Sequence, residues 1–319
     1  MLGDKFNLII KMSKKNLKNK VVVTGGVGFI GSNLVKVLIE KGFNVHIIDN
    51  LVAGEGHINK KARLHKVSIT DYKKILPIIK GAEYVFHLAA LPRVQYSIEF
   101  PQKTNEVNVD GTLNVLLAAK EGKVKKVIYS ASSSAYGDQP IMPLREDMLA
   151  MPKSPYGLQK YYGELQCRLF SEVYNLPTVS LRYFNVYGPN QSDEGAYALV
   201  IAKFLKQVKD NKPMTITGDG KQTRDFTHVY DVVKANILAA ESNMVSGEVI
   251  NIGAGNNHSI KKIAELIGGK IEYIPTRLEP KDTLADNSKA KKLLGWKPEV
   301  SIEEGIGELK KILKIAKNN

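Results

Sequence analysis

Cysteine is almost absent from this chain of 319 residues, and the single Cys167 excludes an internal disulfide and a cysteine-rich metal site. No apolar run approaches the roughly 20 residues that a membrane-spanning helix needs. Near the start, Phe6–Ile10 is too short for the apolar region of a signal peptide, and no small-residue cleavage site follows it. We therefore expect a cytoplasmic protein with no membrane partner.

Arginine is also scarce, although the formal net charge is +14. Only seven of the 46 Lys and Arg residues are Arg, and many lysines are scattered over expected helix faces. A local lysine cluster precedes the first expected strand, at Lys11, Lys14, Lys15, Lys18 and Lys20. Because no aromatic-interleaved basic face or nucleic-acid motif accompanies it, we interpret residues 1–19 as a solvated basic tail and expect no specific nucleic acid. The positions of the few arginines are more informative about a phosphate-binding site, since Lys cannot replace the bidentate guanidinium group of Arg.

What the chain does contain is a glycine-rich turn between a strand and a helix. The hydrophobic residues 21–24 lead into Gly25, Gly28 and Gly31, and residues 30–41 have the apolar spacing of a helix. Gly25 permits a tight turn, Gly28 lets a pyrophosphate approach the backbone, and Gly31 lets the helix pack closely on the strand. The pyrophosphate then meets the free N–H groups at the start of the helix. The alternative is that the glycines only shape a turn.

The second expected strand, 44–48, ends at Asp49, near the distance from the glycines at which an acid meets the adenosine ribose. Its charge would repel a 2′-phosphate, and no Arg immediately follows it. The sequence therefore predicts NAD and not NADP as the cofactor.

Strand-like runs alternate with helical patterns through about residue 183, which predicts an α/β protein with a Rossmann-type doubly wound parallel sheet. The expected strands are 21–24, 44–48, 63–67, 83–88, 125–130 and 178–183. The expected helices of this part are 30–41, 72–80, 104–121 and 155–174. Beyond Asn190 the alternation breaks up, and the expected helices are 197–210, 229–242, 259–268 and 302–317. We expect residues 20–189 to form an NAD-binding domain. Residues 190–319 are expected to form mainly a smaller mixed α/β lobe that binds the substrate. Within that range, the segment at about 229–254 is a candidate to rejoin the NAD-binding domain.

Three polar residues form a candidate catalytic group. Ser132 follows the fifth expected strand, and Tyr156 and Lys160 lie four apart just inside a helix, so they share one helix face. The Lys160 ammonium would lower the pKa of the Tyr156 phenol, and Ser132 would hydrogen-bond the same substrate oxygen. A phenol tuned in this way can exchange a proton with a sugar hydroxyl while a hydride moves to or from nicotinamide. The alternative is a helix with surface Tyr and Lys beside a Ser-rich turn.

From Val21 to about Pro298 the chain resembles the extended short-chain dehydrogenase/reductase family, and within it the nucleotide-sugar 4-epimerases. The motifs that carry the resemblance lie at 24–31, 87–90, 132–137, 156–160, 181–189, 218–220, 224–229, 285–286 and 293–298.

The resemblance implies site residues. For the cofactor they are Gly25, Gly28, Phe29, Ile30, Gly31, Asp49, Asn50, Ile69, Asp71, Leu88, Ala89, Ala90, Tyr156, Lys160 and Tyr183. For the substrate they are Val94, Ser133, Ser134, Asn185, Ala198, Arg224, Arg277 and Thr283. Arg224 and Arg277 would clamp a diphosphate; the alternative is structural salt bridges, for example with Asp225 or Glu279. His87 is expected to be a packed residue, and His228 has no companion ligands, so we expect no metal.

The resemblance also narrows the reaction. Related dehydratases and decarboxylases carry carboxylates after the catalytic serine, whereas residues 132–137 carry none, which favours inversion at C4. The resemblance places the small Thr283 where a bulky Tyr restricts relatives to glucose and galactose. We therefore expect a UDP-N-acetylglucosamine/UDP-N-acetylgalactosamine 4-epimerase with tightly held NAD. UDP-glucose and UDP-galactose are expected as weaker substrates.

Other readings stay open. Arg93 near the sugar suggests UDP-glucuronate, and a dehydratase, a decarboxylase or a reductase would use the same scaffold. A non-catalytic protein that binds a nucleotide and contacts RNA is a further alternative. By resemblance, helices 104–121 and 155–174 would pair with their copies in a homodimer.

Overall fold

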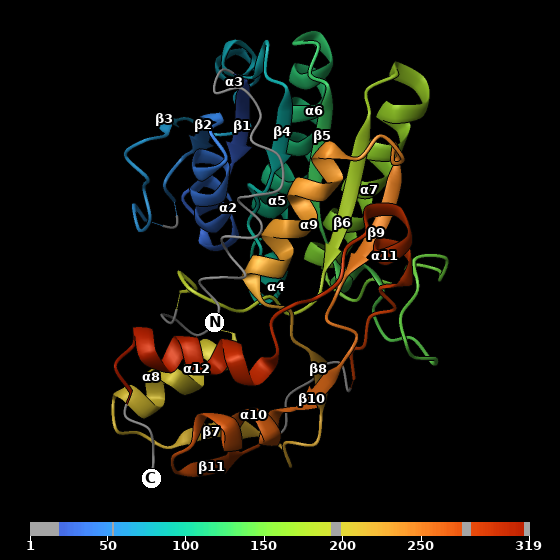
Figure 1. Cartoon of the computed structure of the whole chain (residues 1–319). Helices are drawn as coiled ribbons and strands as arrows, with labels where there is room; N and C mark the ends of the chain where they lie inside the picture. Colours follow the sequence, from blue (N-terminus) through green and yellow to red (C-terminus); the bar gives the residue numbers. More distant parts are fainter. Residues whose placement is uncertain (1–18, 53, 193–198, 276–281, 316–319) are drawn as a thin grey trace.

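The protein consists of a layered α/β part and a smaller lobe beneath the carboxyl ends of its strands (Figure 1). The computed structural model describes residues 19–52, 54–192, 199–275 and 282–315. Seven parallel strands form the large sheet in the order β3-β2-β1-β4-β5-β6-β9. Their bounds are β1 Lys20–Thr24, β2 Asn44–Asp49, β3 Arg63–Lys66, β4 Tyr84–His87, β5 Lys126–Ser132, β6 Thr178–Tyr183 and β9 Glu248–Ile252. The predicted Rossmann-type fold is confirmed, and the strand order reverses between β1 and β4, where such sheets bind ligands.

Helices cover both faces of this sheet. On one face lie α2 (Phe29–Glu40), α9 (Val229–Glu241) and α11 (Ser288–Leu294); on the other lie α3 (Tyr72–Ile79), α6 (Gly111–Glu121) and α7 (Pro155–Tyr174). Successive strand residues point to opposite faces, so Val21 and Val23 pack in the core under α2 while Val22 packs in the core under α6. This burial on both sides explains why the strands are continuous hydrophobic runs in the sequence.

The helix expected at 104–121 is interrupted. It is replaced by α5 (Pro101–Asn105), a π-helical turn at Glu106–Asp110, and α6. Within the π turn, the buried Asn108 side chain accepts a hydrogen bond from the N–H of Leu91 at 2.8 Å and donates one to Gln159 of α7 at 2.8 Å. Such turns recur near functional sites because they redirect a side chain out of the regular helical register.

The smaller lobe has its own apolar core, which includes Phe204, Ile216, Ile263 and Ile306. Its elements are α8 (Val200–Lys209), β7 (Met214–Thr217), β8 (Thr223–Asp225), β10 (Asn257–Ser259), α10 (Ile260–Ile267), β11 (Ile271–Ile274) and α12 (Ile302–Ile312). β7 pairs with β11 in parallel, and β8 pairs with β10 antiparallel. Within the described ranges, no helix combines the length and apolar character needed to cross a membrane.

Candidate active site

The glycine turn between β1 and α2 is closely packed at two of its three glycines. Gly25 has a φ of +69°, and a Cβ added there would lie 2.7 Å from the backbone nitrogen of Ala89. A Cβ on Gly31 would lie 2.1 Å from the carbonyl oxygen of Gly25. Both positions therefore require glycine to keep the turn and the approach of the helix.

Gly28 differs from its two neighbours. Among the described residues, an added Cβ there would meet only the Gly25 oxygen, at 3.4 Å, so the described part of the chain leaves space beside it. Gly28 is the N-cap of α2 and provides no capping side chain, and Phe29 and Ile30 open the helix. A bare helix start beside open space fits a pyrophosphate, because the N–H groups of the first turn and the helix dipole both favour an anion. The residues present thus fit NAD.

Asp49 ties the end of β2 to this turn. Its carboxylate accepts hydrogen bonds from the N–H groups of Val27 at 3.1 Å and Leu51 at 2.9 Å. The next side chain, Asn50, accepts a hydrogen bond from the N–H of Val52 at 3.2 Å. The ribose contact of Asp49 stays a prediction, which its position beside the glycine turn supports.

The segment predicted to meet adenine is largely occupied by contacts within the protein. Asp71 is the N-cap of α3, where its carboxylate accepts the N–H of Lys74 and pairs with the Lys74 ammonium at 2.7 Å. The hydrogen bond with Lys74 lowers the pKa of Asp71. The Ile69 side chain is buried in the core against Gly111. The sequence pattern alone gave no sign of either contact.

The residues after β4 are anchored to β1 by a buried histidine. His87 Nδ1 lies 2.8 Å from the Thr24 hydroxyl, and its Nε2 lies 3.0 Å from the Thr112 hydroxyl. The same Thr24 hydroxyl accepts a hydrogen bond from the N–H of Ala89 at 3.2 Å, which fixes the Leu88–Ala90 segment beside Gly25. Burial lowers the pKa of His87 to about 3, so the ring is neutral. His87 is a packed residue, as predicted.

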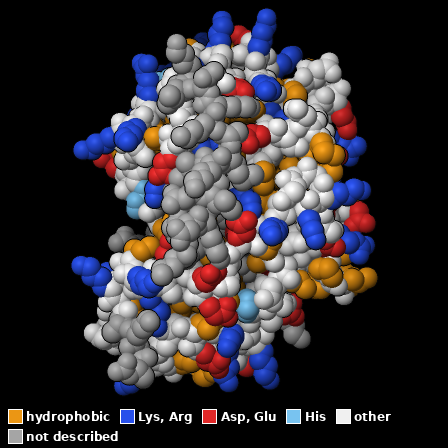
Figure 2. Space-filling view, viewed as in Figure 1, with side chains coloured by type: hydrophobic (Ala, Val, Ile, Leu, Met, Phe, Trp, Pro, Cys, Tyr) orange, Lys and Arg blue, Asp and Glu red, His pale blue; other side chains and the backbone are white. Residues whose placement is uncertain are grey.

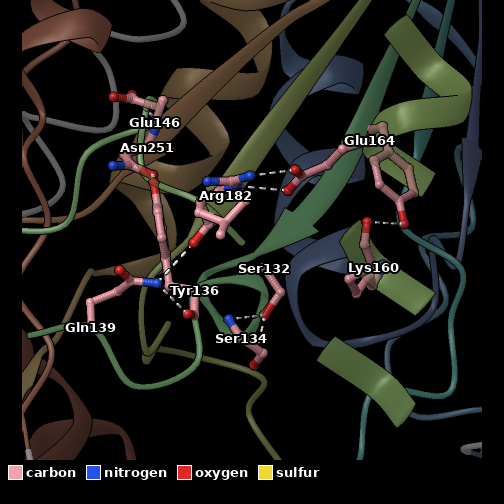
Figure 3. A network of polar contacts seen from close by, with 11 residues as sticks. Ser132, Ser134, Tyr136, Gln139, Glu146, Lys160, Glu164, Arg182 and Asn251 are labelled. Carbon is pink, nitrogen blue, oxygen red and sulfur yellow. Dashed lines mark hydrogen bonds and ion pairs between the residues drawn. The ribbon is translucent and has the colours of Figure 1, made fainter. Parts of the chain in front are cut away.

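The three candidate catalytic residues come together at the carboxyl end of β5. Ser132 ends this strand, and its Oγ accepts a hydrogen bond from the N–H of Ser134 at 3.2 Å (Figure 3). Tyr156 and Lys160 lie in the first turns of α7, which begins at Pro155 under the N-cap Ser154. Both side chains are buried.

A short additional helix, α4 (Val94–Glu99), fixes the start of α7. The Tyr156 N–H donates to the hydroxyl of Ser97 at 3.0 Å. The Ser97 hydroxyl in turn donates to the carbonyl oxygen of Val94 at 2.6 Å. Sequence reasoning missed Ser97, because nothing in its spacing relates it to Tyr156.

The predicted lowering of the Tyr156 pKa by Lys160 is wrong for the chain on its own. Burial raises the pKa of Tyr156 to about 12, and the hydrogen bond with Ser132 only partly opposes this rise. Lys160 instead donates to the carbonyl oxygen of Ser130 at 2.7 Å, and burial lowers its pKa to about 8. Desolvation dominates because both groups lie away from water.

Tyr183, predicted to contact the cofactor, has a hydroxyl that is engaged within the protein. It lies 3.1 Å from the hydroxyl of Ser130 and accepts a hydrogen bond from the Asn236 amide at 2.8 Å. Burial raises its pKa to about 12. A contact of Tyr183 with the cofactor would therefore involve its ring or backbone and not its hydroxyl.

A cavity of about 220 Å³ lies between the segment after β6 and the smaller lobe, and Asn185 and Arg224 are among its lining residues. The Asn185 amide donates to the hydroxyl of Thr283 at 3.1 Å, so these predicted substrate residues are brought together. Val94, Ser133 and Ser134 lie instead on the Ser132 side of the site. Ala198 and Arg277 fall outside the described residues.

Asp225 was considered above as a salt-bridge partner of Arg224, but its carboxylate binds backbone N–H groups. Its buried carboxylate accepts three backbone hydrogen bonds, from Ala254 at 2.8 Å, Gly255 at 3.0 Å and Ala285 at 3.0 Å. It thereby ties β8 to the segment that carries Thr283. Burial raises the pKa of Asp225 to about 6, and the three N–H donors oppose that rise.

The histidine His228 caps α9 and lies 3.2 Å from Glu308. Across the part of the chain that the structure describes, no group of three or more His, Cys, Asp or Glu side chains could hold a metal ion.

Comparison with known proteins agrees with this geometry. The model of the NAD dependent epimerase/dehydratase family matches residues 21–253. This chain belongs to that family. Its cofactor is NAD.

Three relatives illustrate the range of the family. One solved structure is that of UDP-N-acetylglucosamine 4-epimerase from Methanobrevibacter ruminantium in complex with UDP-N-acetylmuramic acid. Its sequence is 39% identical and its TM-score is 0.87; the match covers 92% of this chain and 97% of that chain. UDP-glucose 4-epimerase from Thermotoga maritima, with UDP-glucose, is 37% identical with a TM-score of 0.87, and the coverage is 92% and 99%. A UDP-glucuronate 4-epimerase from Thermodesulfobacterium geofontis is 36% identical, and the match covers 89% of this chain and 93% of the relative.

Proposed function

We propose that this enzyme interconverts UDP-N-acetylglucosamine and UDP-N-acetylgalactosamine by inverting the configuration at C4. The family and its relatives make the chain an NAD-dependent UDP-sugar 4-epimerase. The identity of the sugar rests on one observation: the small Thr283 is hydrogen-bonded to Asn185, and Asn185 lines the cavity between the segment after β6 and the smaller lobe. A small residue there leaves room for an N-acetyl group.

The protein groups in this reaction bind, orient and move a proton. Tyr156 would take the proton of the 4-hydroxyl, and Ser132 would hold the same oxygen in place. NAD, when bound, would be the acceptor and then the donor of the hydride. Its positive charge would favour the phenolate form of Tyr156. The 4-keto sugar would turn within the site before reduction on its opposite face. Because no net oxidation occurs, NAD should stay bound between turnovers.

Elimination and decarboxylation are less well supported. Both need an acid or base near the outer carbons of the sugar, yet residues 132–137 contain no carboxylate. The nearby Glu164 is paired with Arg182, and Glu146 accepts the N–H of Asn251 at 2.7 Å. Both carboxylates therefore already have protein partners.

The substitution Thr283→Tyr tests the choice of sugar. A bulky ring beside Asn185 should remove most turnover of UDP-N-acetylglucosamine while leaving UDP-glucose turnover measurable. The measurement is kcat/KM on both sugars, with Thr283→Val as the control that replaces the hydroxyl by a methyl group of similar size. Equal loss on both sugars in Thr283→Tyr would contradict the assignment of Thr283 as the gate.

UDP-glucuronate is a second candidate, and Arg93 favours it. Arg93 is the N-cap of α4, the helix whose Ser97 binds the backbone of Tyr156, so it lies close to the catalytic group. If the substrate is a uronate, Arg93→Gln should raise the KM for UDP-glucuronate and leave that for UDP-N-acetylglucosamine unchanged.

We further propose a homodimer through α6 and α7, because α7 turns its polar face inward. Gln159, Lys160 and Glu164 are buried against the sheet. Large apolar side chains on the outer faces of both helices are exposed: Leu113, Leu117, Leu158, Tyr162, Leu165, Leu169 and Val173. A second copy would cover this surface.

A cytoplasmic location and the lack of a nucleic-acid partner stay predictions. On the face seen in Figure 2, Lys and Arg side chains are interspersed with Asp and Glu and do not gather in one basic patch.

A further inference from the structure

A buried ion pair connects the helix of Tyr156 and Lys160 to the neighbouring strand. Glu164 lies one helical turn beyond Lys160 on α7, and Arg182 lies on β6. Arg182 Nε and Nη2 donate to the two carboxylate oxygens of Glu164 at 2.8 and 2.6 Å, and both side chains are almost fully buried (Figure 3). This is the bidentate geometry for which Arg is suited and Lys is not.

The pair continues into the turn that carries Ser132. The Arg182 guanidinium lies over the ring of Tyr136, 4.5 Å from its centroid. Tyr136 directly follows the short helical turn Ser133–Ala135, and its hydroxyl donates to the Asn251 side chain at 2.7 Å. The ring is fully buried, so the turn is held at a fixed distance from α7.

Asn251 extends the network to the segment that carries Thr283. Its amide donates to the carbonyl oxygens of Leu144 at 2.8 Å and Asp286 at 3.2 Å. Leu144 also forms a parallel bridge with Ala285. One polar network therefore contacts the catalytic helix, the serine turn and the proposed specificity segment.

Such a pair is a poor way to gain stability alone. Removing two charges from water is costly, and well-packed apolar side chains are often as stabilising. A pair that joins three functional segments instead defines their relative positions. We propose that Glu164 and Arg182 are positioning residues, which fix the Ser132 turn against α7 through Tyr136 and place an anion one turn from Lys160. This inference rests on the proposed epimerase function.

The groups around Lys160 support the second part of this role. His87 on β4 and Tyr129 on β5 face it, and Glu164 and Cys167 share its helix. Burial lowers the pKa of His87 and raises those of Tyr129 and Cys167, so all three are neutral near pH 7. Burial raises the pKa of Glu164 as well, but its pairing with Arg182 opposes this rise and favours the carboxylate. Cys167 and then Glu164 are the groups that raise the pKa of Lys160 against the effect of burial, and of these two Glu164 is the one that carries a charge near pH 7.

The test replaces both members at once, because a single removal would leave an unpaired buried charge. The double variant Glu164→Leu/Arg182→Met should fold with a melting temperature near that of the wild type and retain NAD. The matched control is Arg168→Met/Glu172→Leu, which changes an exposed pair on the same helix. We expect an unchanged KM for UDP-N-acetylglucosamine but a kcat roughly 10- to 100-fold lower than in the control, the size expected for misplaced catalytic groups.

A second readout does not depend on turnover. The 13C-lysine NMR signal of Lys160, assigned with Lys160→Met, should titrate at lower pH in Glu164→Gln than in the wild type and in Glu172→Gln. Glu164→Gln leaves the Arg182 charge without its carboxylate but retains a hydrogen bond to it, so the melting temperature of this variant is measured beside its titration. A wild-type kcat in the folded double variant, or an unmoved Lys160 titration in Glu164→Gln, would overturn the inference. A wild type that converts no UDP-sugar would instead refute the proposed function and leave the titration as the test.

Discussion

Tyr156 and Lys160 have pKa values shifted in opposite directions by the same cause, their burial in the layer between α7 and the sheet. Burial disfavours the charged form of each group, so the phenol holds its proton more tightly and the ammonium holds its proton less tightly. The sequence identified both residues from their spacing. It could not give the direction of the Tyr156 shift, because spacing contains no information about desolvation.

The pH dependence of turnover should report Lys160. Its pKa is lowered to about 8, so raising the pH through that value removes the ammonium that we expect to hold the nicotinamide ribose beside Tyr156. We expect kcat to fall on the alkaline side with an apparent pKa near 8 when measured from about pH 6 to about pH 10. NAD content is measured at each pH as the control. A kcat that stays level to the top of this range, with NAD retained, would refute the role of Lys160.

The individual elements differ in how far the sequence predicts them. Buried parallel strands and the glycine turn have strong local signatures, and α7 was expected with the bounds that the structure has. The orientation of α7 was not predictable, because its leucines have core-like spacing yet face outward. The contact of Glu164 with Arg182 was also missed, since residues on separate elements meet only through the sheet topology.

Substitutions at two glycines of the turn should differ in their effect on the fold, although both should weaken NAD binding. Gly31→Ala should lower the melting temperature and abolish NAD binding, because the new Cβ would lie 2.1 Å from the Gly25 oxygen. Gly28→Ala should keep the fold but weaken NAD binding by about tenfold or more, near 1.4 kcal/mol, since the methyl group would occupy the space proposed for the pyrophosphate. The measurements are melting temperature and NAD content.

The control is Gly307→Ala on α12, where an added Cβ meets no atom of the described residues within 4 Å. It should bind NAD normally and gain up to about 1 kcal/mol of stability, because Ala favours a helix over Gly. Normal NAD binding in Gly28→Ala would show that the pyrophosphate lies elsewhere.

The arrangement of the two parts follows from the parallel sheet. Its strands end at one edge, and the smaller lobe lies beneath that edge (Figure 1). The glycine turn follows β1 there, and Ser132 ends β5 there. The alternation of strands and helices predicted the large sheet. The loss of that alternation beyond Asn190 marked where the chain begins to contribute to the smaller lobe. The pairing of the short strands in the lobe had no comparable signal, because strands of three or four residues carry little periodicity.

Association through the exposed apolar side chains of α7 should be disrupted by charge. Leu165→Glu/Leu169→Glu places two anions on this surface, and we expect it to sediment as a monomer. The wild type should sediment at twice the chain mass of 35.3 kDa. Ile312→Glu, an exposed position on α12 of the smaller lobe, is the control. A wild type that sediments as a monomer would remove the proposed interface.

The most direct measurement is NMR of the product after purified protein is incubated with UDP-N-acetylglucosamine and no added NAD. The account predicts UDP-N-acetylgalactosamine of unchanged mass, formed to equilibrium without accumulation of NADH. A product of altered mass, or an unchanged substrate with NAD bound and UDP-glucose or UDP-glucuronate converted in parallel samples, would contradict it.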